Sequence, residues 1–418
     1  MTSRERLRAA LAHRQGDRPP MDFGATHVTG MNVSTVHKLR QALLGEKDYR
    51  VKVIEPYQML GEIDPKLAEA LGVDVVGVMG PRTMFGFENR DFKPLTLFDG
   101  TEVLVPGMFN ITTDEKGDWY IYPEGDTSVP PSGRMPKDGF YFDAICRQEP
   151  IDEDNLSVAD NLEEFGPLAK ETVDFMVASA RRAAAAEKGA ILSAPGTAFG
   201  DIALVPAMWM KRTKGIRDVA EWYMATAANR PYVRAIFEKQ CEIGLANLAV
   251  LAKALGDDVQ AAFVTGTDFG TQNGLFISPD AYRDLYQPFH KQITGFIHAN
   301  TNWKVFIHSC GAVAELIPDF IESGFDILNP VQCSACGMDP QMLKDKFGDR
   351  MTFWGGAVDT QKTLPFGTAR QVYDEVRRRI EILGKGGGFV FNAIHNIQAG
   401  VPIENVLALF RAFRDSSN

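Results

Sequence analysis

Cysteine is scarce in this sequence: five residues out of 418, an odd number at positions that form no regular framework. Disulfide-stabilised secreted domains show the opposite pattern. Residues 1–14 are rich in charge and lack the apolar segment of a secretory signal peptide. A chain of this length also buries a substantial hydrophobic core without covalent cross-links. We therefore expect a reduced, cytoplasmic protein.

Long apolar runs and blocks of positive charge are also missing. No segment approaches the roughly 18 apolar residues of a membrane-spanning helix. The chain has 44 Lys and Arg against 54 Asp and Glu, a net charge of −10, and no long run of basic residues. Nucleic acids and anionic membranes both require concentrated positive charge. The composition favours a globular protein that binds neither nucleic acid nor a membrane.

Eight short apolar runs are the candidates for buried strands, and they lie at residues 21–24, 74–79, 190–195, 260–265, 303–308, 326–331, 351–355 and 388–393. Helical periodicity appears between most of them, including residues 162–187, 232–255, 281–299, 313–323 and 371–383. Strands that alternate with helices pair in parallel, so this α/β pattern predicts a (β/α)8 TIM barrel. A doubly wound open sheet is the alternative, but no glycine-rich dinucleotide fingerprint follows an early strand.

One stretch interrupts this alternation. Residues 99–143 are rich in Gly, Pro, Asp and aromatic side chains, with turn signals at Asp99-Gly100 and Asp138-Gly139. We expect an antiparallel β-hairpin insertion over residues 92–150, after the second strand, where it would shape access to the barrel mouth. An insertion with no role in function is the alternative. The predicted organisation is a single barrel domain, 1–418, that contains this insertion.

The most informative motif is His308-Ser309-Cys310-Gly311, at the end of the fifth predicted strand. Imidazole and thiolate are both zinc ligands, and the carboxyl ends of barrel strands are where active sites lie. His-x-Cys alone is a weak signal, because a core histidine beside a buried thiol produces the same sequence pattern. A catalytic zinc site needs a third protein ligand.

Three residues could supply that ligand. Cys333 and Cys336 follow the sixth strand, and their Cys-x-x-Cys spacing suits either a metal or a redox pair. His395 follows the eighth strand. The set His308, Cys310 and His395 would leave zinc one open coordination position, as in catalytic sites. Strands five and eight are not neighbours in a barrel, so these side chains would have to meet across its mouth.

Acidic residues also follow predicted strands. Asp268 comes after the fourth strand, where a carboxylate could orient a ligand, act as a general acid or anchor a substrate. A helix or turn cap is the alternative role. Asp359 follows the seventh strand with the same two interpretations, and Asp22 and His27 flank the first strand as weaker candidates.

Four elements together resemble the uroporphyrinogen decarboxylase superfamily: the N-terminal helix that ends in Asp17-Arg18-Pro19-Pro20, the His308 motif, residues 354–359 and residues 401–406. The resemblance runs over nearly the whole chain and implies a (β/α)8 barrel. Two activities dominate that superfamily. One is cofactor-free porphyrinogen decarboxylation, and the other is zinc-dependent methyl transfer to or from a corrinoid protein.

The sequence departs from the decarboxylases at two elements. Their Met-Arg-Gln-Ala-Gly-Arg segment, which grips substrate carboxylates, is replaced at residues 21–27, and their aspartate beyond the second strand is replaced at residues 79–82. The methyltransferase branch uses His-x-Cys after the fifth strand and a cysteine after the eighth as zinc ligands. His308 and Cys310 match two of these positions, and the third falls on His395, a histidine in place of cysteine.

The methyltransferase resemblance implies Zn²⁺ and a cobalamin carried by a partner corrinoid protein, because this chain lacks an Asp-x-His-x-x-Gly cobalamin signature. The other partner would be a small-molecule methyl donor, or a thiol or folate acceptor. Zinc with two imidazoles and one thiolate keeps a net positive charge, which favours O-demethylation of a methoxy compound, with Asp268 assisting the leaving group. Superfamily members often form dimers, so a homodimer is also expected. A metal-free decarboxylase or lyase acting on a small acid is the alternative function.

Overall fold

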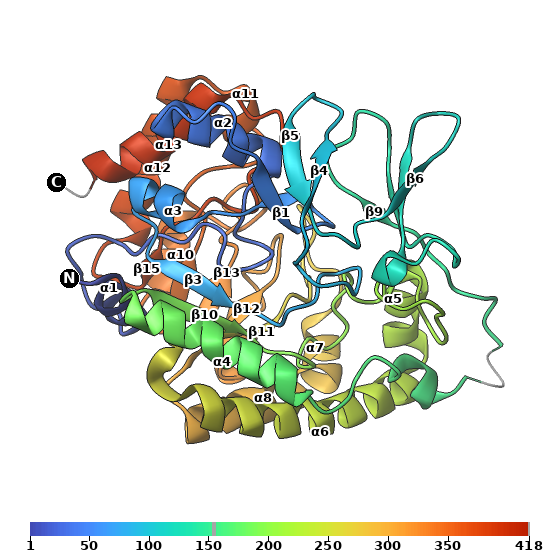
Figure 1. Cartoon of the computed structure of the whole chain (residues 1–418). Coiled ribbons are helices and arrows are strands. Elements are labelled where there is room, and N and C mark those ends of the chain that lie inside the picture. The colour runs from blue at the N-terminus through green and yellow to red at the C-terminus, as the bar shows by residue number, and fades with distance from the viewer. Residues whose placement is uncertain (153–155, 417–418) are drawn as a thin grey trace.

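A parallel sheet forms the centre of the computed structural model, which describes residues 1–152 and 156–416 (Figure 1). Its strand order is β15-β14-β13-β12-β11-β10-β3. The strands are β3 (Val75–Val78), β10 (Gly189–Ser193), β11 (Ala261–Thr265), β12 (Lys304–His308), β13 (Ile327–Asn329), β14 (Thr352–Trp354) and β15 (Phe389–Val390). Every one of these strands overlaps a run that the sequence predicts.

The segment around Met21 closes this sheet. Asp22 N donates to the Phe391 carbonyl at 3.0 Å, and Phe391 N donates to the Pro20 carbonyl at 2.8 Å. On its other side, Asp74 N donates to the Met21 carbonyl at 2.8 Å. The first predicted strand therefore bridges the two edges of the sheet as a short parallel contact. The barrel prediction is confirmed, and the open-sheet alternative is wrong.

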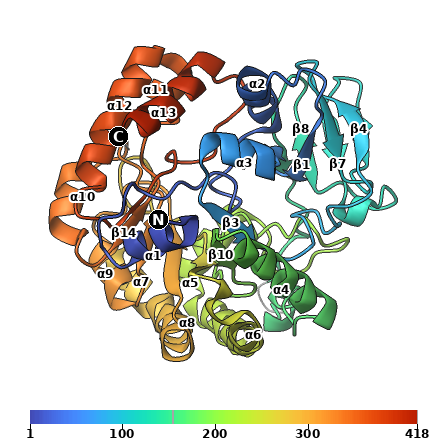
Figure 2. The same cartoon turned by 60° about the vertical axis from the view of Figure 1, so that its left-hand side comes forward.

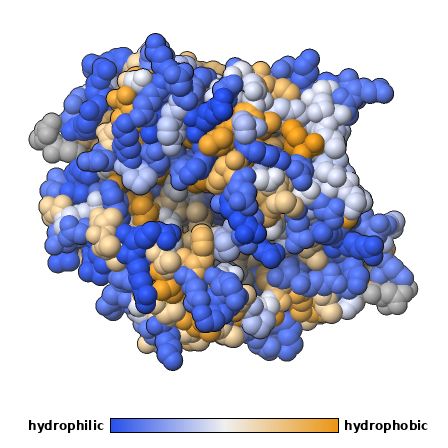
Figure 3. All heavy atoms as spheres, in the orientation of Figure 1, coloured by the Kyte–Doolittle hydropathy of each residue, from blue (hydrophilic) through white to orange (hydrophobic). Residues whose placement is uncertain are grey.

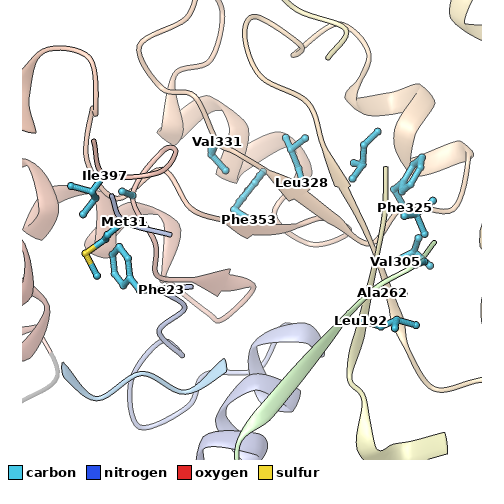
Figure 4. Packing of buried hydrophobic residues seen from close by; sticks show 14 of the residues in the cluster. Phe23, Met31, Leu192, Ala262, Val305, Phe325, Leu328, Val331, Phe353 and Ile397 are labelled. Carbon is cyan, nitrogen blue, oxygen red and sulfur yellow. The ribbon is translucent and has the colours of Figure 1, made fainter. Parts of the chain in front are cut away.

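Side chains alternate between the inside and the outside of the barrel along each strand, as the pleat requires. The inner cluster includes Ile191, Ala261, Phe306, Ile327, Trp354 and Val390. Phe306 and Trp354 come from strands that are not neighbours, and their rings meet with centroids 5.4 Å apart. The residues next to them in sequence pack outward against the helices, and Figure 4 labels Leu192, Ala262, Val305, Leu328 and Phe353 among them.

Helix α1 (Ser3–Leu11) closes the amino-terminal end of the barrel (Figure 2). Thr2 and Glu5 form a capping box at its first turn. Leu7 and Leu11 of this helix belong to the inner cluster. With this end closed, the carboxyl ends of the strands are the end open to a ligand.

The remaining helices surround the strands (Figure 2). They are α2 (Val33–Leu44), α3 (Pro65–Leu71), α4 (Lys170–Ala185), α5 (Val219–Ala228), α6 (Arg230–Leu255), α7 (Pro279–Leu285), α8 (Gln287–Asn300), α9 (Ile317–Glu322), α10 (Pro340–Phe347), α11 (Thr363–Phe366), α12 (Ala369–Leu383) and α13 (Ile403–Asp415). The predicted helix at 162–187 begins only at Lys170, after the helix-breaking pair Gly166-Pro167. The predicted helix at 281–299 is divided at Tyr286, just before Pro288 in the first turn of α8.

Two further sheets lie outside the barrel. One has the order β2-β1-β5-β4 and the other β6-β7-β8-β9. Their strands are β1 (Val51–Glu55), β2 (Leu60–Gly61), β4 (Lys93–Thr96), β5 (Glu102–Val105), β6 (Ile111–Thr113), β7 (Trp119–Ile121), β8 (Gly133–Met135) and β9 (Asp143–Ala144). The antiparallel pairs of residues 93–144 lie between β3 and β10. This region is larger than a single hairpin, and β5 also pairs in parallel with β1.

Hydrophilic residues dominate the face seen in Figure 3, with hydrophobic residues scattered between them. Short 3-10 helices connect some of the elements: η1 (Pro123–Gly125), η3 (Val158–Asn161) and η4 (Gly256–Asp258). Over residues 1–152 and 156–416, none of the helices combines the length and the apolar character needed to cross a membrane.

Candidate metal centre

His308 is the last residue of β12, and the alternation of that strand directs its side chain into the barrel. Phe306, two residues earlier, belongs to the inner cluster. On the next strand, Asn329 stands two residues after the inner-cluster residue Ile327, and the register pairs His308 with Asn329. The two polar side chains therefore lie side by side at the carboxyl end of the barrel, and His308 Nδ1 is 2.6 Å from Asn329 Oδ1.

The Asn329 amide determines the tautomer of His308. Asn329 Nδ2 donates to the Trp354 carbonyl at 2.8 Å, which leaves Oδ1 facing the imidazole. Because an amide oxygen only accepts hydrogen bonds, His308 Nδ1 must carry the proton. His308 Nε2 is then unprotonated, and it lies 3.4 Å from Cys310 Sγ. A metal-binding histidine is oriented in the same way by a partner on its other nitrogen.

The loop that carries Cys310 is held by backbone contacts on both sides. Cys310 N donates to Asp268 Oδ1 at 2.6 Å, and Gly311 N donates to Gln332 Oε1 at 2.7 Å. Gly311 has φ +90°, and a Cβ atom there would stand 2.4 Å from the Gly270 carbonyl carbon. Only glycine allows this approach, which packs the loop after β12 against the loop after β11.

His395 completes the group from the loop after β15. Its ring meets that of His308 edge-on, with centroids 5.5 Å apart and an interplanar angle of 68°. One ligand atom from each of His308, Cys310 and His395 lies within 4.8 Å of the others. The ends of strands five and eight thus do meet across the mouth. Among the described residues this is the one such cluster, and it includes neither Cys333 nor Cys336.

Burial controls the protonation of all three side chains. Loss of hydration lowers the pKa of His308 to about 4, although the Asn329 contact opposes that shift. Burial also lowers the pKa of His395 to about 4, with a further contribution from His308. The pKa of the Cys310 thiol is raised well above its usual value by burial and by the nearby Asp268 carboxylate. At neutral pH the site therefore offers two neutral imidazoles, and the thiol ionises once a cation compensates its charge.

Two carboxyl groups border the cluster. Burial raises the pKa of Asp268, even though the Cys310 N–H favours its ionised form. The Tyr223 hydroxyl donates to the backbone carbonyl of Asp268 at 3.1 Å. Asp201 follows β10, and burial with the neighbouring Asp268 charge raises its pKa to about 7. Sequence reasoning missed Asp201, although an acidic residue shortly after the third strand was the same signal that identified Asp268.

The weaker candidates lie outside the cluster. Asp359 Oδ1 accepts from the backbone N–H groups of Gln361 at 2.7 Å and Lys362 at 3.2 Å, which is a turn-capping role. Asp22 is fully buried and accepts from Trp354 Nε1 at 2.9 Å, so it supports the barrel interior. Neither Asp22 nor His27 contributes to the group around His308.

Comparison with known proteins places this barrel in a family. Residues 149–416, well over half of the chain, match the family described as uroporphyrinogen decarboxylase (URO-D). The chain belongs to the uroporphyrinogen decarboxylase family. The matched part of this family member contains all three residues of the cluster, together with Asp201 and Asp268.

Individual relatives of this family member are distant. It is 25% identical over 173 residues to a uroporphyrinogen decarboxylase from Thioalkalivibrio sulfidiphilus (strain HL-EbGR7), a match that covers 39% of this chain. The match spans 46% of that relative's length, so the chain covers about half of the curated relative. A solved methyltransferase from Methanosarcina mazei superposes with a TM-score of 0.53, at 16% identity and with 99% of each chain covered. This structural likeness extends over the whole fold.

Proposed function

We propose that this chain is a zinc-dependent methyltransferase that moves a methyl group between a small molecule and a corrinoid protein. The observation that carries the proposal is the cluster of His308, Cys310 and His395 at the open end of the barrel. The fold likeness to the Methanosarcina mazei methyltransferase supports the same proposal. The small molecule is a methoxy compound or a thiol.

The donor set suits zinc. Two imidazole nitrogens and one thiol sulfur are typical zinc ligands, and three protein ligands leave a position for substrate. Asn329 supplies the outer contact that presents His308 Nε2, and the Asp268 carboxylate holds the Cys310 backbone. A zinc ion bound by these residues would supply Lewis acidity toward an ether oxygen, or would lower the pKa of a bound thiol.

The chain's own carboxyl groups would control the proton at the reacting oxygen or sulfur. Asp268 Oδ1 is engaged by the Cys310 N–H, which fixes this carboxylate beside the cluster. Asp201 lies close to the same loop. Its Oδ2 is only 2.6 Å from the position that a Cβ atom would take on Gly266, two residues before Asp268. An alkoxide or phenolate leaving group needs a proton, and a buried carboxyl group with a raised pKa is suited to donate one.

The methyl group would pass to or from the cobalt of a cobalamin, which we assign to a separate corrinoid protein. Helix α1 covers the amino-terminal end of the barrel, so a partner would approach the carboxyl ends of the strands. There the cluster residues are only partly covered: His308 is buried, whereas Cys310 and His395 keep partial exposure. Folate or a thiol would serve as acceptor in the reverse direction.

Methyl transfer to cob(I)alamin tests the proposal. Purified protein, reconstituted with zinc, is incubated with free cob(I)alamin and methoxybenzene, methanol or methanethiol, and methylcobalamin is followed by its absorption spectrum. We expect turnover that a zinc chelator abolishes and added zinc restores. A chelator-insensitive release of CO2 from a small acid, without methyl transfer, would instead establish the metal-free decarboxylase or lyase.

A further inference from the structure

A second feature of the open end is a cavity of about 230 Å³ beside Asp201. It lies between the loop after β10, the segment around η3 and helices α5 and α6. The aromatic and aliphatic side chains in its wall are Phe165, Leu204, Val205, Trp209, Trp222 and Ile236. Small-molecule sites are typically concave, mostly apolar and supplied with a few polar groups.

Asp201 connects this cavity with the metal cluster. It lines the cavity, and its Oδ2 lies 2.6 Å from the position that a Cβ atom on Gly266 would take. Gly266 directly follows β11 and stands two residues before Asp268, whose carboxylate accepts from the Cys310 N–H. Asp201 Oδ1 is fixed by the Ala203 N–H at 3.0 Å. One carboxyl group therefore separates the apolar cavity from the site where the chemistry is proposed.

The cavity offers no free positive charge among the described residues that line it. Its one cation, Arg217, is 1% exposed and contacts Glu164 twice, with Nη1 at 2.7 Å from Oε1 and Nη2 at 3.0 Å from Oε2. Arg217 Nε and Nη2 also donate to the Lys214 and Asp160 carbonyls. Since this guanidinium is neutralised and occupied, a carboxylate or phosphate ligand would find no counter-charge here.

We infer that this cavity binds the ring of an uncharged aromatic methyl ether, with the ether oxygen directed toward Asp201, which protonates the departing oxygen. The inference rests on the proposed function and deepens it by naming the methyl donor. Aromatic walls suit a flat ring, and the volume lies just below the roughly 300 Å³ at which drug-sized ligand sites begin. Burial supports the role of Asp201, since its pKa of about 7 leaves a large fraction protonated at neutral pH.

The reaction balances with the corrinoid as methyl acceptor. The bond between the ether oxygen and the methyl carbon breaks, and its electron pair stays on oxygen. Cobalt(I) of the corrinoid supplies the electron pair of the new bond to the methyl carbon. Asp201 gives its proton to the oxygen, so a neutral phenol leaves and the Asp201 carboxylate is reprotonated from water.

Binding alone tests the cavity, without metal or corrinoid. Methoxybenzene is titrated into the full chain while tryptophan fluorescence is recorded, because Trp209 and Trp222 line the cavity. Ala198→Phe fills the cavity and should weaken binding at least tenfold. Ala249→Phe makes the same change at an exposed position of α6 that does not line the cavity and should leave the affinity unchanged. Equal affinity in both variants, no saturable binding to the parent, or equally tight binding of benzoate would overturn the assignment.

Asp201→Asn tests the proton donor. We expect the Kd for methoxybenzene to stay within threefold and the rate of transfer to cob(I)alamin to fall at least 100-fold. The parent rate should also decline as the pH rises above about 7, and this decline should be absent in the variant. An unchanged rate would overturn the role of Asp201. Binding that Ala198→Phe abolishes, without methyl transfer under any condition, would support the cavity and contradict the proposed function.

Discussion

Asn329 Oδ1 lies 2.6 Å from Nδ1 of His308, and this contact decides which ring nitrogen faces Cys310. The relationship follows from the barrel itself, because the two residues end adjacent parallel strands at paired positions. The second amide contact, to the Trp354 carbonyl, prevents the Asn329 side chain from presenting its nitrogen instead. The strand register thereby places an unprotonated imidazole nitrogen, His308 Nε2, beside Cys310.

Replacing Asn329 with leucine should weaken zinc binding about 10- to 100-fold, because His308 loses the acceptor that fixes its tautomer and ring orientation. Competition with a chromophoric chelator measures the affinity. Asn405→Leu is the matched control, since Asn405 is also buried but donates to the Leu364 and Gly367 carbonyls. Equal zinc affinities in the two variants would show that the Asn329 contact does not support the site.

Gly311→Ala should lower both thermal stability and zinc affinity. A residue other than glycine at φ +90° is strained by about 1–3 kcal/mol, and the new Cβ would overlap the Gly270 backbone. The loop that carries Cys310 must then move. Gly274→Ala is the control, because no atom lies within 4 Å of its added Cβ. Differential scanning calorimetry should show a lower Tm for Gly311→Ala alone, and equal Tm values would contradict the proposed packing.

Asp74→Ala should cost about 3–5 kcal/mol of unfolding free energy, because it leaves two arginines without their buried partner. Asp74 is 1% exposed and receives Arg6 Nη1 at 2.7 Å and Arg18 Nη1 at 2.6 Å. Asp174→Ala removes only an exposed pair with Lys170 and should cost less than about 1 kcal/mol. Urea unfolding compares the two. The folded Asp74→Ala protein should keep its metal content, because Asp74 lies at the opposite end of the barrel.

Asp22 should make the native state less stable as the pH rises. Burial raises its pKa from 3.8 to about 7, so between these values the folded protein holds a proton that the unfolded chain has lost. Unfolding free energy should therefore decrease by up to about 1.4 kcal/mol per pH unit through this group. Asp22→Asn should remove that slope between pH 5 and 7 in urea titrations. Any hydrogen-bond cost of the amide is independent of pH, so parallel pH profiles for the parent and the variant would refute the assignment.

The barrel could be predicted from the sequence because its strands are buried on both faces and read as short apolar runs. The His308 and Cys310 positions followed from the same reasoning, since His308 ends the fifth run and Cys310 lies two residues beyond it. The meeting of His308 with His395 could not be derived from the spacing of residues, because it depends on how inward-facing side chains converge across the closed barrel.

Other features depend on contacts between distant segments. The parallel pairing of β1 with β5 joins residues about 50 positions apart, and the sequence of neither strand indicates that it pairs with the other. The division between α7 and α8 arises at Tyr286, two residues before Pro288, and helical periodicity alone does not reveal this break. Asp201 could be recognised as a candidate functional residue only from its contact with Gly266 and its position in the cavity wall.

Metal analysis of the purified protein, run beside His308→Ala, Cys310→Ala and His395→Ala, decides whether the three-residue cluster binds zinc. We expect about one zinc per chain in the parent and its loss in each of the three variants. Cys333→Ala and Cys336→Ala should retain the metal, because neither residue belongs to the cluster. A parent that binds no zinc even after repletion, or one that loses zinc only when Cys333 or Cys336 is changed, would rule out this cluster as a zinc site.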